Sequence, residues 1–178
     1  AVWQGAEARR VKRLEQAHFA LAFEGPGYLD PDFYAAQIWT AALGGGMSSR
    51  LFQKIREERG LCYSIFAQSG FHDDTGMVTI YAGTSGEQLA ELSHLTIDEI
   101  RRSAEDLAES EVARAKAQLK AGLLMGLESP SGQAERMARA LTIWGRVPDA
   151  AEVAARIDAV TAADVRDHAQ RIIARARP

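Results

Sequence analysis

The chain has 178 residues, the length of one ordinary domain. Hydrophobic residues make up 47% of it and charged residues 25%, which excludes a disordered tail, a collagen and a disulfide-rich miniprotein. The 21 basic and 24 acidic side chains give a net charge of -3, so no basic surplus exists to bind the phosphates of a nucleic acid. The single cysteine, Cys62, excludes an intrachain disulfide and a zinc site built from cysteines.

Residues 1–14 are polar and irregular, and they contain neither an initiator Met nor the apolar stretch of a signal peptide. No run of the chain approaches the roughly 18 apolar residues that a membrane span needs, so we expect no membrane partner. We interpret residues 1–14 as a linker and residues 15–178 as a single domain. The missing signal peptide leads us to expect a cytoplasmic location in a bacterium.

The first two elements of this domain are predicted to be a strand and a helix. Polar and apolar residues alternate over 15–25, which indicates a strand with one buried face. Asp30 followed by Pro31 is typical of a helix start, with aspartate as the N-cap and proline in the first helical position. We therefore predict a helix over 31–43 with a single buried stripe.

Three consecutive glycines, Gly44, Gly45 and Gly46, interrupt the helical pattern, because glycine is costly inside a helix. A second helix is predicted over 48–59, and Gly60 follows it in the position where glycine commonly ends a helix. The glycines have two interpretations. They form a tight corner between two helices, or they form a surface at which a second chain approaches the backbone closely.

Two strands follow, over 61–71 and 76–84, and the polar turn between them predicts an antiparallel hairpin. The remaining chain is predicted to be helical. Its helices cover 86–105, 110–129, 131–145, 149–158 and a last segment that opens with a T-x-x-D capping box at Thr161 and Asp164. This order predicts an α+β fold, in which an antiparallel or mixed sheet is covered on one face by helices.

The histidines do not form a zinc-peptidase motif. Such motifs place two imidazoles one helical turn apart with a glutamate beside them. The four histidines of this chain are all isolated from one another: His18, His72, His94 and His168. We therefore predict no metal site in this chain.

Arg56 and Tyr63 are the candidate functional pair. Arg56 is placed late in the second predicted helix, and Tyr63 is placed just inside the following strand. A guanidinium can bind a carbonyl or a carboxylate, and a phenol can donate to an oxygen that gains negative charge. The alternative is that Arg56 belongs to a solvated charged face and that Tyr63 is a half-buried residue of the sheet.

The chain closely resembles the C-terminal homology domain of the pitrilysin (insulinase) family, and most strongly its bacterial members that are similar to mitochondrial processing peptidases. The most specific part of the resemblance is the segment LGGGMSSRLFQKIREERGLCYSIFAQSGFHDDTGMVTIYAGT. Upstream and downstream segments also fit, so that the resemblance covers nearly the whole chain from about residue 7.

The resemblance implies a zinc metalloendopeptidase built from two similar α+β halves that close around an unfolded peptide. Zinc would be held by an N-terminal half through H-x-x-E-H, and residues 1–14 would be the linker from that missing half. Arg56 would hold the main chain of the substrate, and Tyr63 would stabilise the tetrahedral oxyanion. Gly44, Gly45 and Gly46 match a glycine-rich loop that takes part in presequence recognition in processing peptidases.

The leading hypothesis is therefore a substrate-binding half that binds no zinc and is inactive alone, within an enzyme that cleaves unfolded or presequence-like peptides. The expected partners are the peptide substrate and the N-terminal catalytic half, in the same chain or in a separate subunit. A homodimer is a further expectation, because an isolated half exposes the face that its partner would cover. Two other hypotheses are a non-catalytic scaffold subunit of the same fold and a module that binds small anions at the glycine-rich segment.

Overall fold

The computed structural model describes residues 7–11 and 14–175, so the predicted linker over 1–14 lies partly outside the described residues. The described residues form three strands, six α-helices and one π-helix. They are β1 (Ala17–Gly25), α1 (Phe33–Gly44), the π-helix η1 (Phe52–Glu57), β2 (Ser64–Phe71), β3 (Gly76–Thr84), α2 (Leu89–Asp106), α3 (Glu109–Gly126), α4 (Pro130–Trp144), α5 (Ala150–Ala159) and α6 (Ala162–Arg175).

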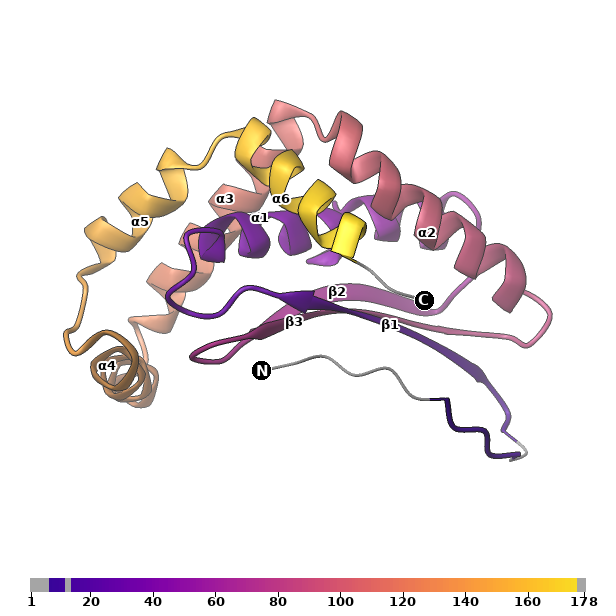
Figure 1. The fold of residues 1–178 in the computed structure, drawn as a ribbon, viewed down its shortest axis with the longest axis horizontal. Coiled ribbons are helices and arrows are strands. Elements are labelled where there is room, and N and C mark those ends of the chain that lie inside the picture. Colours follow the sequence, from indigo (N-terminus) through magenta and orange to yellow (C-terminus); the bar gives the residue numbers. More distant parts are fainter. Residues whose placement is uncertain (1–6, 12–13, 176–178) are drawn as a thin grey trace.

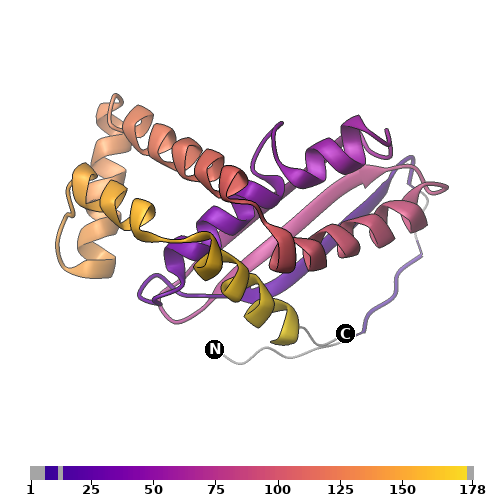
Figure 2. The same cartoon turned by 90° about the horizontal axis from the view of Figure 1, so that it is seen from above.

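The described strands form one antiparallel sheet of three strands in the order β1-β3-β2. Phe71 pairs with Gly76 across the predicted hairpin. Helices α1, α2 and α6 lie on one side of the sheet, with α1 directly above it, as Figures 1 and 2 show from two directions. This arrangement confirms the predicted α+β class, with an antiparallel sheet covered by helices on one face. No helix in the described part of the chain is long and apolar enough to cross a membrane.

Helix α1 is the centre of the core. Ile38, Trp39 and Leu43 are completely buried, because the sheet covers α1 from one side and helices α3 and α6 pack against it from the other. The prediction of a single buried stripe on this helix is therefore wrong. Its composition, rich in alanine and large apolar residues, is what a helix surrounded by protein requires.

The start of α1 also differs from the prediction. Asp30 does not cap the helix; its Oδ1 accepts a hydrogen bond from the backbone N–H of Asp32 at 2.8 Å, which closes a turn before the helix. Asp32 is the N-cap residue, and its side chain makes no cap hydrogen bond. Its carboxylate instead binds His168 and Arg171 of α6.

The second predicted helix is shorter and wider than expected. Its main part is the π-helix η1, in which the N–H of Glu58 donates to the carbonyl of Gln53 at 2.9 Å. Gly60 ends this segment with a φ of 63°, as predicted. Its N–H donates to the carbonyl of Arg56, and the N–H of Leu61 donates to that of Ile55, a nested pair of bonds like that of a glycine helix cap but one residue wider, as the π-helix requires.

The later helices begin and end where local signals place them. The capping box at Thr161 and Asp164 forms as predicted, with the N–H of Asp164 donating to Thr161 Oγ1 at 3.1 Å and the reverse bond at 2.8 Å. Gly145 ends α4 with a φ of 66°. Helices α4 and α5 lie at one end of the molecule, away from the sheet (Figure 1).

Candidate functional site

Arg56 and Tyr63 lie together at the corner between η1 and β2. The guanidinium carbon of Arg56 lies 4.4 Å from the ring centroid of Phe52, which precedes it on η1. The same carbon lies 6.0 Å from the ring centroid of Tyr63. These are cation–π distances, so the aromatic rings hold the guanidinium near Tyr63 without occupying its N–H groups.

The polar ends of both side chains are available for a ligand. Among the described residues, Arg56 has one ion pair, at 3.7 Å to Glu57, which is longer than a hydrogen bond. Tyr63 is 86% exposed, so it is not a half-buried residue of the sheet. It also lies just before β2 rather than inside the strand. Its backbone N–H donates to the carbonyl of Gly83 at 3.2 Å, which fixes its position against β3.

The short connection between η1 and β2 is rigid. The glycine cap at Gly60 ends the helix, and Thr84 Oγ1 donates to the carbonyl of Leu61 at 2.5 Å. Cys62 is buried in this connection, and burial raises the pKa of its thiol although the charge of Arg56 opposes the shift. Cys62 is therefore a protonated packing residue, and it helps to fix the backbone that carries Tyr63.

The three glycines differ in what surrounds them. A Cβ on Gly44 would collide with the backbone nitrogen of Ala67 in β2, so glycine is needed there for α1 to approach the sheet. A Cβ on Gly45 would lie 2.6 Å from Ala41 Cα. Gly46 is exposed, and its Cβ would meet only the side chain of Gln118, at 3.5 Å. Packing within the chain therefore explains Gly44 and Gly45 but not Gly46.

The carbonyl groups of the glycine-rich turn are bonded within the chain. Ser49 Oγ donates to the carbonyl of Gly46 at 2.6 Å, and Gln118 Nε2 donates to that of Gly45 at 2.7 Å. Gln53 Nε2 donates to the carbonyl of Met47 at 2.6 Å. The turn is thus a fixed corner whose outer surface, at Gly46 and Met47, faces solvent.

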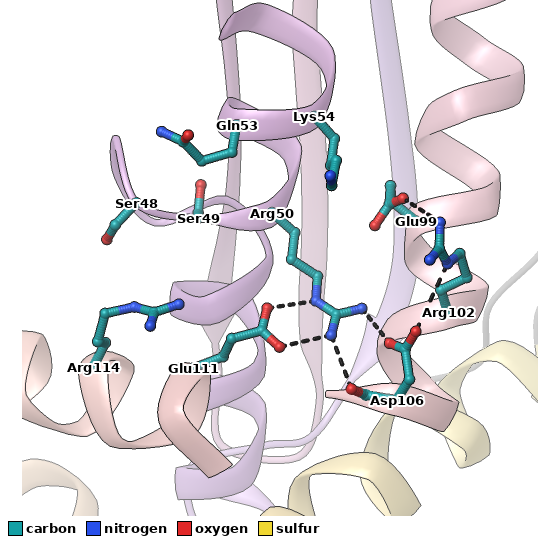
Figure 3. A pocket seen from close by; sticks show the side chains of 10 residues that line it. All are labelled: Ser48, Ser49, Arg50, Gln53, Lys54, Glu99, Arg102, Asp106, Glu111 and Arg114. Atoms are coloured by element: carbon teal, nitrogen blue, oxygen red, sulfur yellow. Dashed lines mark hydrogen bonds and ion pairs between the residues drawn. The ribbon is translucent and has the colours of Figure 1, made fainter. Parts of the chain in front are cut away.

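A charged cluster that the sequence reasoning missed lies beside this corner. We call it the Arg50 clamp, meaning Arg50 with Asp106 at the end of α2 and Glu111 near the start of α3. It borders a polar cavity of about 270 Å³ (Figure 3). The side chain of Arg50 is only 13% exposed. The residues lining the cavity come from the corner, α2 and α3: Ser48, Ser49, Arg50, Gln53, Lys54, Glu99, Arg102, Asp106, Glu111 and Arg114.

Hydrogen bonds favour the charged forms of Arg50 and Glu111. The pKa of Arg50 is raised above its usual range, chiefly by its hydrogen bonds to Glu111. Burial alone would raise the pKa of Glu111, but hydrogen bonds from Arg50 and from the N–H of Ala108 lower it. The sequence offers only a partial signal, because a glutamate in the first turn of a helix can accept the backbone N–H of the N-cap residue, here Ala108.

The residues that the structure describes do not fit zinc. The described residues contain no group of three or more histidine, cysteine, aspartate or glutamate side chains that could hold a metal ion. His168 is hydrogen-bonded to Asp32, and His18 is hydrogen-bonded to Tyr81. These imidazoles therefore have structural partners in separate parts of the fold.

The comparison with protein families identifies the domain. The family model described as the peptidase M16 inactive domain matches residues 4–119, which is more than half of the chain. The chain belongs to the peptidase M16 family. This finding confirms the resemblance that the segment around the three glycines and Tyr63 indicates, and the matched region includes the whole of that segment.

Proteins of several organisms are similar to nearly all of this chain. An uncharacterised zinc protease of Streptomyces coelicolor is 36% identical over 165 residues, which is 92% of this chain and 36% of the relative. A probable mitochondrial-processing peptidase subunit beta of Arabidopsis thaliana is 34% identical over 183 residues, covering 97% of this chain and 34% of the relative. A chain of complex III2 from Candida albicans has a TM-score of 0.78 at 26% identity, covering 89% of this chain and 40% of that one.

The M16 domain described by this structure is one part of such proteins. It spans about a third of the length of the curated relatives that it matches. Those relatives are named zinc proteases or a processing-peptidase subunit, whereas the matched family model is the inactive domain.

Proposed function

We propose that this M16 domain is the substrate-binding half of a clamshell zinc metalloendopeptidase that cleaves unfolded peptides or presequence-like segments. Zinc would be bound by an N-terminal catalytic half, in the same chain or in a separate subunit, and would supply the Lewis acid for peptide hydrolysis. The names of the relatives support the reaction class. The domain alone would be folded and proteolytically silent. We also propose that residues 15–178 are the single domain and that residues 1–14 link it to the catalytic half.

The observation that carries this proposal is the placement of Arg56 beside Tyr63, with the Arg56 side chain 34% exposed and Tyr63 86% exposed. The guanidinium of Arg56 has donors free to bind main-chain carbonyl groups of an extended peptide. The phenol of Tyr63 can donate to the substrate oxygen that gains negative charge when the scissile carbonyl becomes tetrahedral. Neither group has a structural hydrogen bond among the described residues that would explain its presence at this corner.

The glycine-rich corner contributes a second contact in this proposal. Gly46 leaves the backbone uncovered at an exposed position that packing does not explain. A peptide or the catalytic half could approach closely there, because no side chain intervenes. Gly44 and Gly45 would act indirectly, by allowing the tight corner that presents Gly46.

The experiment uses the complete protein, in which the catalytic half is present, and an unstructured fluorogenic peptide. We expect Arg56→Ala to lower kcat/KM about a hundredfold, and Tyr63→Phe to lower kcat by at least about tenfold with little change in KM. Arg59→Ala is the matched control, because Arg59 belongs to the same charged segment and pairs with Glu91 at 3.5 Å. It should leave the rate unchanged.

The same measurement distinguishes the proposed function from the alternative of a non-catalytic scaffold subunit. The likeness to a chain of complex III2 favours that alternative, because it shows the same fold inside a respiratory assembly. A complete protein that cleaves no peptide, or that cleaves equally well with Arg56→Ala and Tyr63→Phe, would contradict the proposed role of this half. If separately produced catalytic half gains activity only when this chain is added, the two halves act together.

A further inference from the structure

Arg50 connects the corner to two other helices through nearly all of its donors. Its Nε and Nη2 donate to the two carboxylate oxygens of Glu111 at 2.6 and 2.7 Å. Its Nη1 donates to Asp106 Oδ1 at 2.5 Å, and its Nη2 also donates to the carbonyl of Asp106 at 3.1 Å. Figure 3 shows the guanidinium between these two residues. Such a bidentate pair fixes direction as well as distance, which a lysine could not reproduce.

The acceptors of the clamp are themselves held in place. Glu111 Oε2 also accepts the N–H of Ala108 at 2.8 Å, so its carboxylate is part of the start of α3. Asp106 ends α2, and the next residue, Leu107, is completely buried. The clamp therefore ties the corner to the rigid junction of α2 and α3 rather than to a mobile surface side chain.

The same short segment carries Arg56. Arg50 begins the helical turn that continues into η1, and the glycine cap at Gly60 closes the other end of that segment. Leu51 and Ile55 are completely buried between the two fixed ends. The position of the Arg56 guanidinium relative to Tyr63 is thus set by two restraints, the clamp before η1 and the cap after it. A π-helix is rare and is found frequently at functional sites. The π-helical form of η1 is therefore consistent with a functional segment that is held in place at both ends.

We propose that Arg50 is a positioning residue for peptide cleavage: its bonds to Asp106 and Glu111 hold η1 so that Arg56 lies beside Tyr63. This inference rests on the proposed function of Arg56 and Tyr63. Arg50 itself faces the polar cavity and contacts neither of them among the interactions described, so it acts through η1. Small displacements of a positioned group are costly, since a shift of about 1 Å can lower a rate by about a hundredfold.

A double-mutant cycle tests the inference in the complete protein. Arg50→Lys keeps the charge and loses the bidentate geometry, and we expect it to lower kcat/KM about tenfold when Arg56 is present. In an Arg56→Ala background the same change should lower kcat/KM by less than about twofold, because the group that it positions is gone. A purely structural role of Arg50 would lower the rate equally in both backgrounds.

Two further variants keep the test decisive. Glu111→Gln removes the charge of the other partner while keeping its shape, and it should reproduce the same dependence on Arg56 if Arg50→Lys fails to fold. Arg102→Lys is the matched control, because Arg102 contacts Asp106 at 3.7 Å but has no contact with η1 among those described. Equal losses in the two backgrounds, or no loss, would overturn the role of Arg50. An unchanged rate with Arg56→Ala alone would instead overturn the proposed function.

Discussion

The two ends of helix α1 are held by different chemistry. At its start, the carboxylate of Asp32 lies between His168 at 3.1 Å and Arg171 at 2.7 Å, both on α6. At its end, α1 runs through Gly44 into the corner that the Arg50 clamp holds. The first arrangement contains a histidine, the side chain whose ordinary pKa lies closest to neutral pH, and the second contains an arginine and two carboxyl groups. The start of α1 is therefore expected to respond to pH, whereas the end of α1 depends on how the guanidinium of Arg50 is oriented.

The largest loss of stability is expected from removing the carboxylate of Glu111 from the Arg50 clamp. Glu111→Ala would leave Arg50 mostly buried without its bidentate partner, because the two side chains are only 13% and 17% exposed. Arg50 would keep its bonds to Asp106 but lose two charge-assisted hydrogen bonds in a largely buried setting, so we expect the free energy of unfolding to fall by about 3 kcal/mol. Urea unfolding followed by circular dichroism measures it.

An exposed pair of the same kind provides the control. Arg139 and Glu135 form an ion pair on α4, with side chains 56% and 71% exposed. Glu135→Ala should change the free energy of unfolding by less than about 0.5 kcal/mol, as is usual for exposed pairs. If Glu111→Ala is no more costly than Glu135→Ala, the Arg50 clamp does not hold the corner.

A smaller loss of stability is expected when glycines of the corner are replaced, and the loss should differ between Gly44 and Gly46. Gly44→Ala would place a methyl group against the backbone of Ala67, and such overpacking costs about 2 kcal/mol. Gly46→Ala meets only the end of the Gln118 side chain and should cost less than about 0.5 kcal/mol. Thermal unfolding of the two variants measures the difference. Equal costs at the two positions would show that Ala67 does not limit the approach of α1 to the sheet.

Local signals in the sequence were sufficient wherever a structure is decided by adjacent residues. The hairpin between β2 and β3, the cap at Gly60 and the capping box at Thr161 all depend on neighbours within a few positions. The glycine run was recognised for the same reason, but the sequence alone does not show which of its glycines packing requires. Gly44 faces Ala67, a residue of a different element.

The features that the sequence did not predict depend on contacts between distant parts of the chain. Arg50 meets Asp106 and Glu111 only because two later helices fold back over the corner. The burial of most of α1 likewise requires α3 and α6. The position of Tyr63 just before β2, and so its exposure, follows from the glycine cap and the end of the sheet pairing, neither of which has a periodic pattern.

The last predicted effect is the pH dependence at the start of α1. The His168 side chain is 3% exposed, its Nε2 is buried without a hydrogen bond among the described residues, and it lies edge-on to Trp39. Burial lowers the pKa of His168, although Asp32 opposes the shift, and Arg171 and Asp30 act on it more weakly in opposite directions. The folded protein therefore binds this proton less readily than the unfolded chain does.

The sign of the effect follows from that difference. Above an unfolded-state pKa of about 6.5 the neutral imidazole is present in both states and stability is complete. As pH falls below that value the unfolded chain takes up the proton first, so stability declines by at most about 1.4 kcal/mol per pH unit until the folded protein is protonated too. His168→Leu should remove this part of the decline between about pH 7 and pH 5, which urea midpoints at several pH values measure. His94→Gln, at an exposed position of α2, is the control and should leave the decline unchanged. A decline that persists in His168→Leu would mean that other groups, rather than the start of α1, determine the pH dependence.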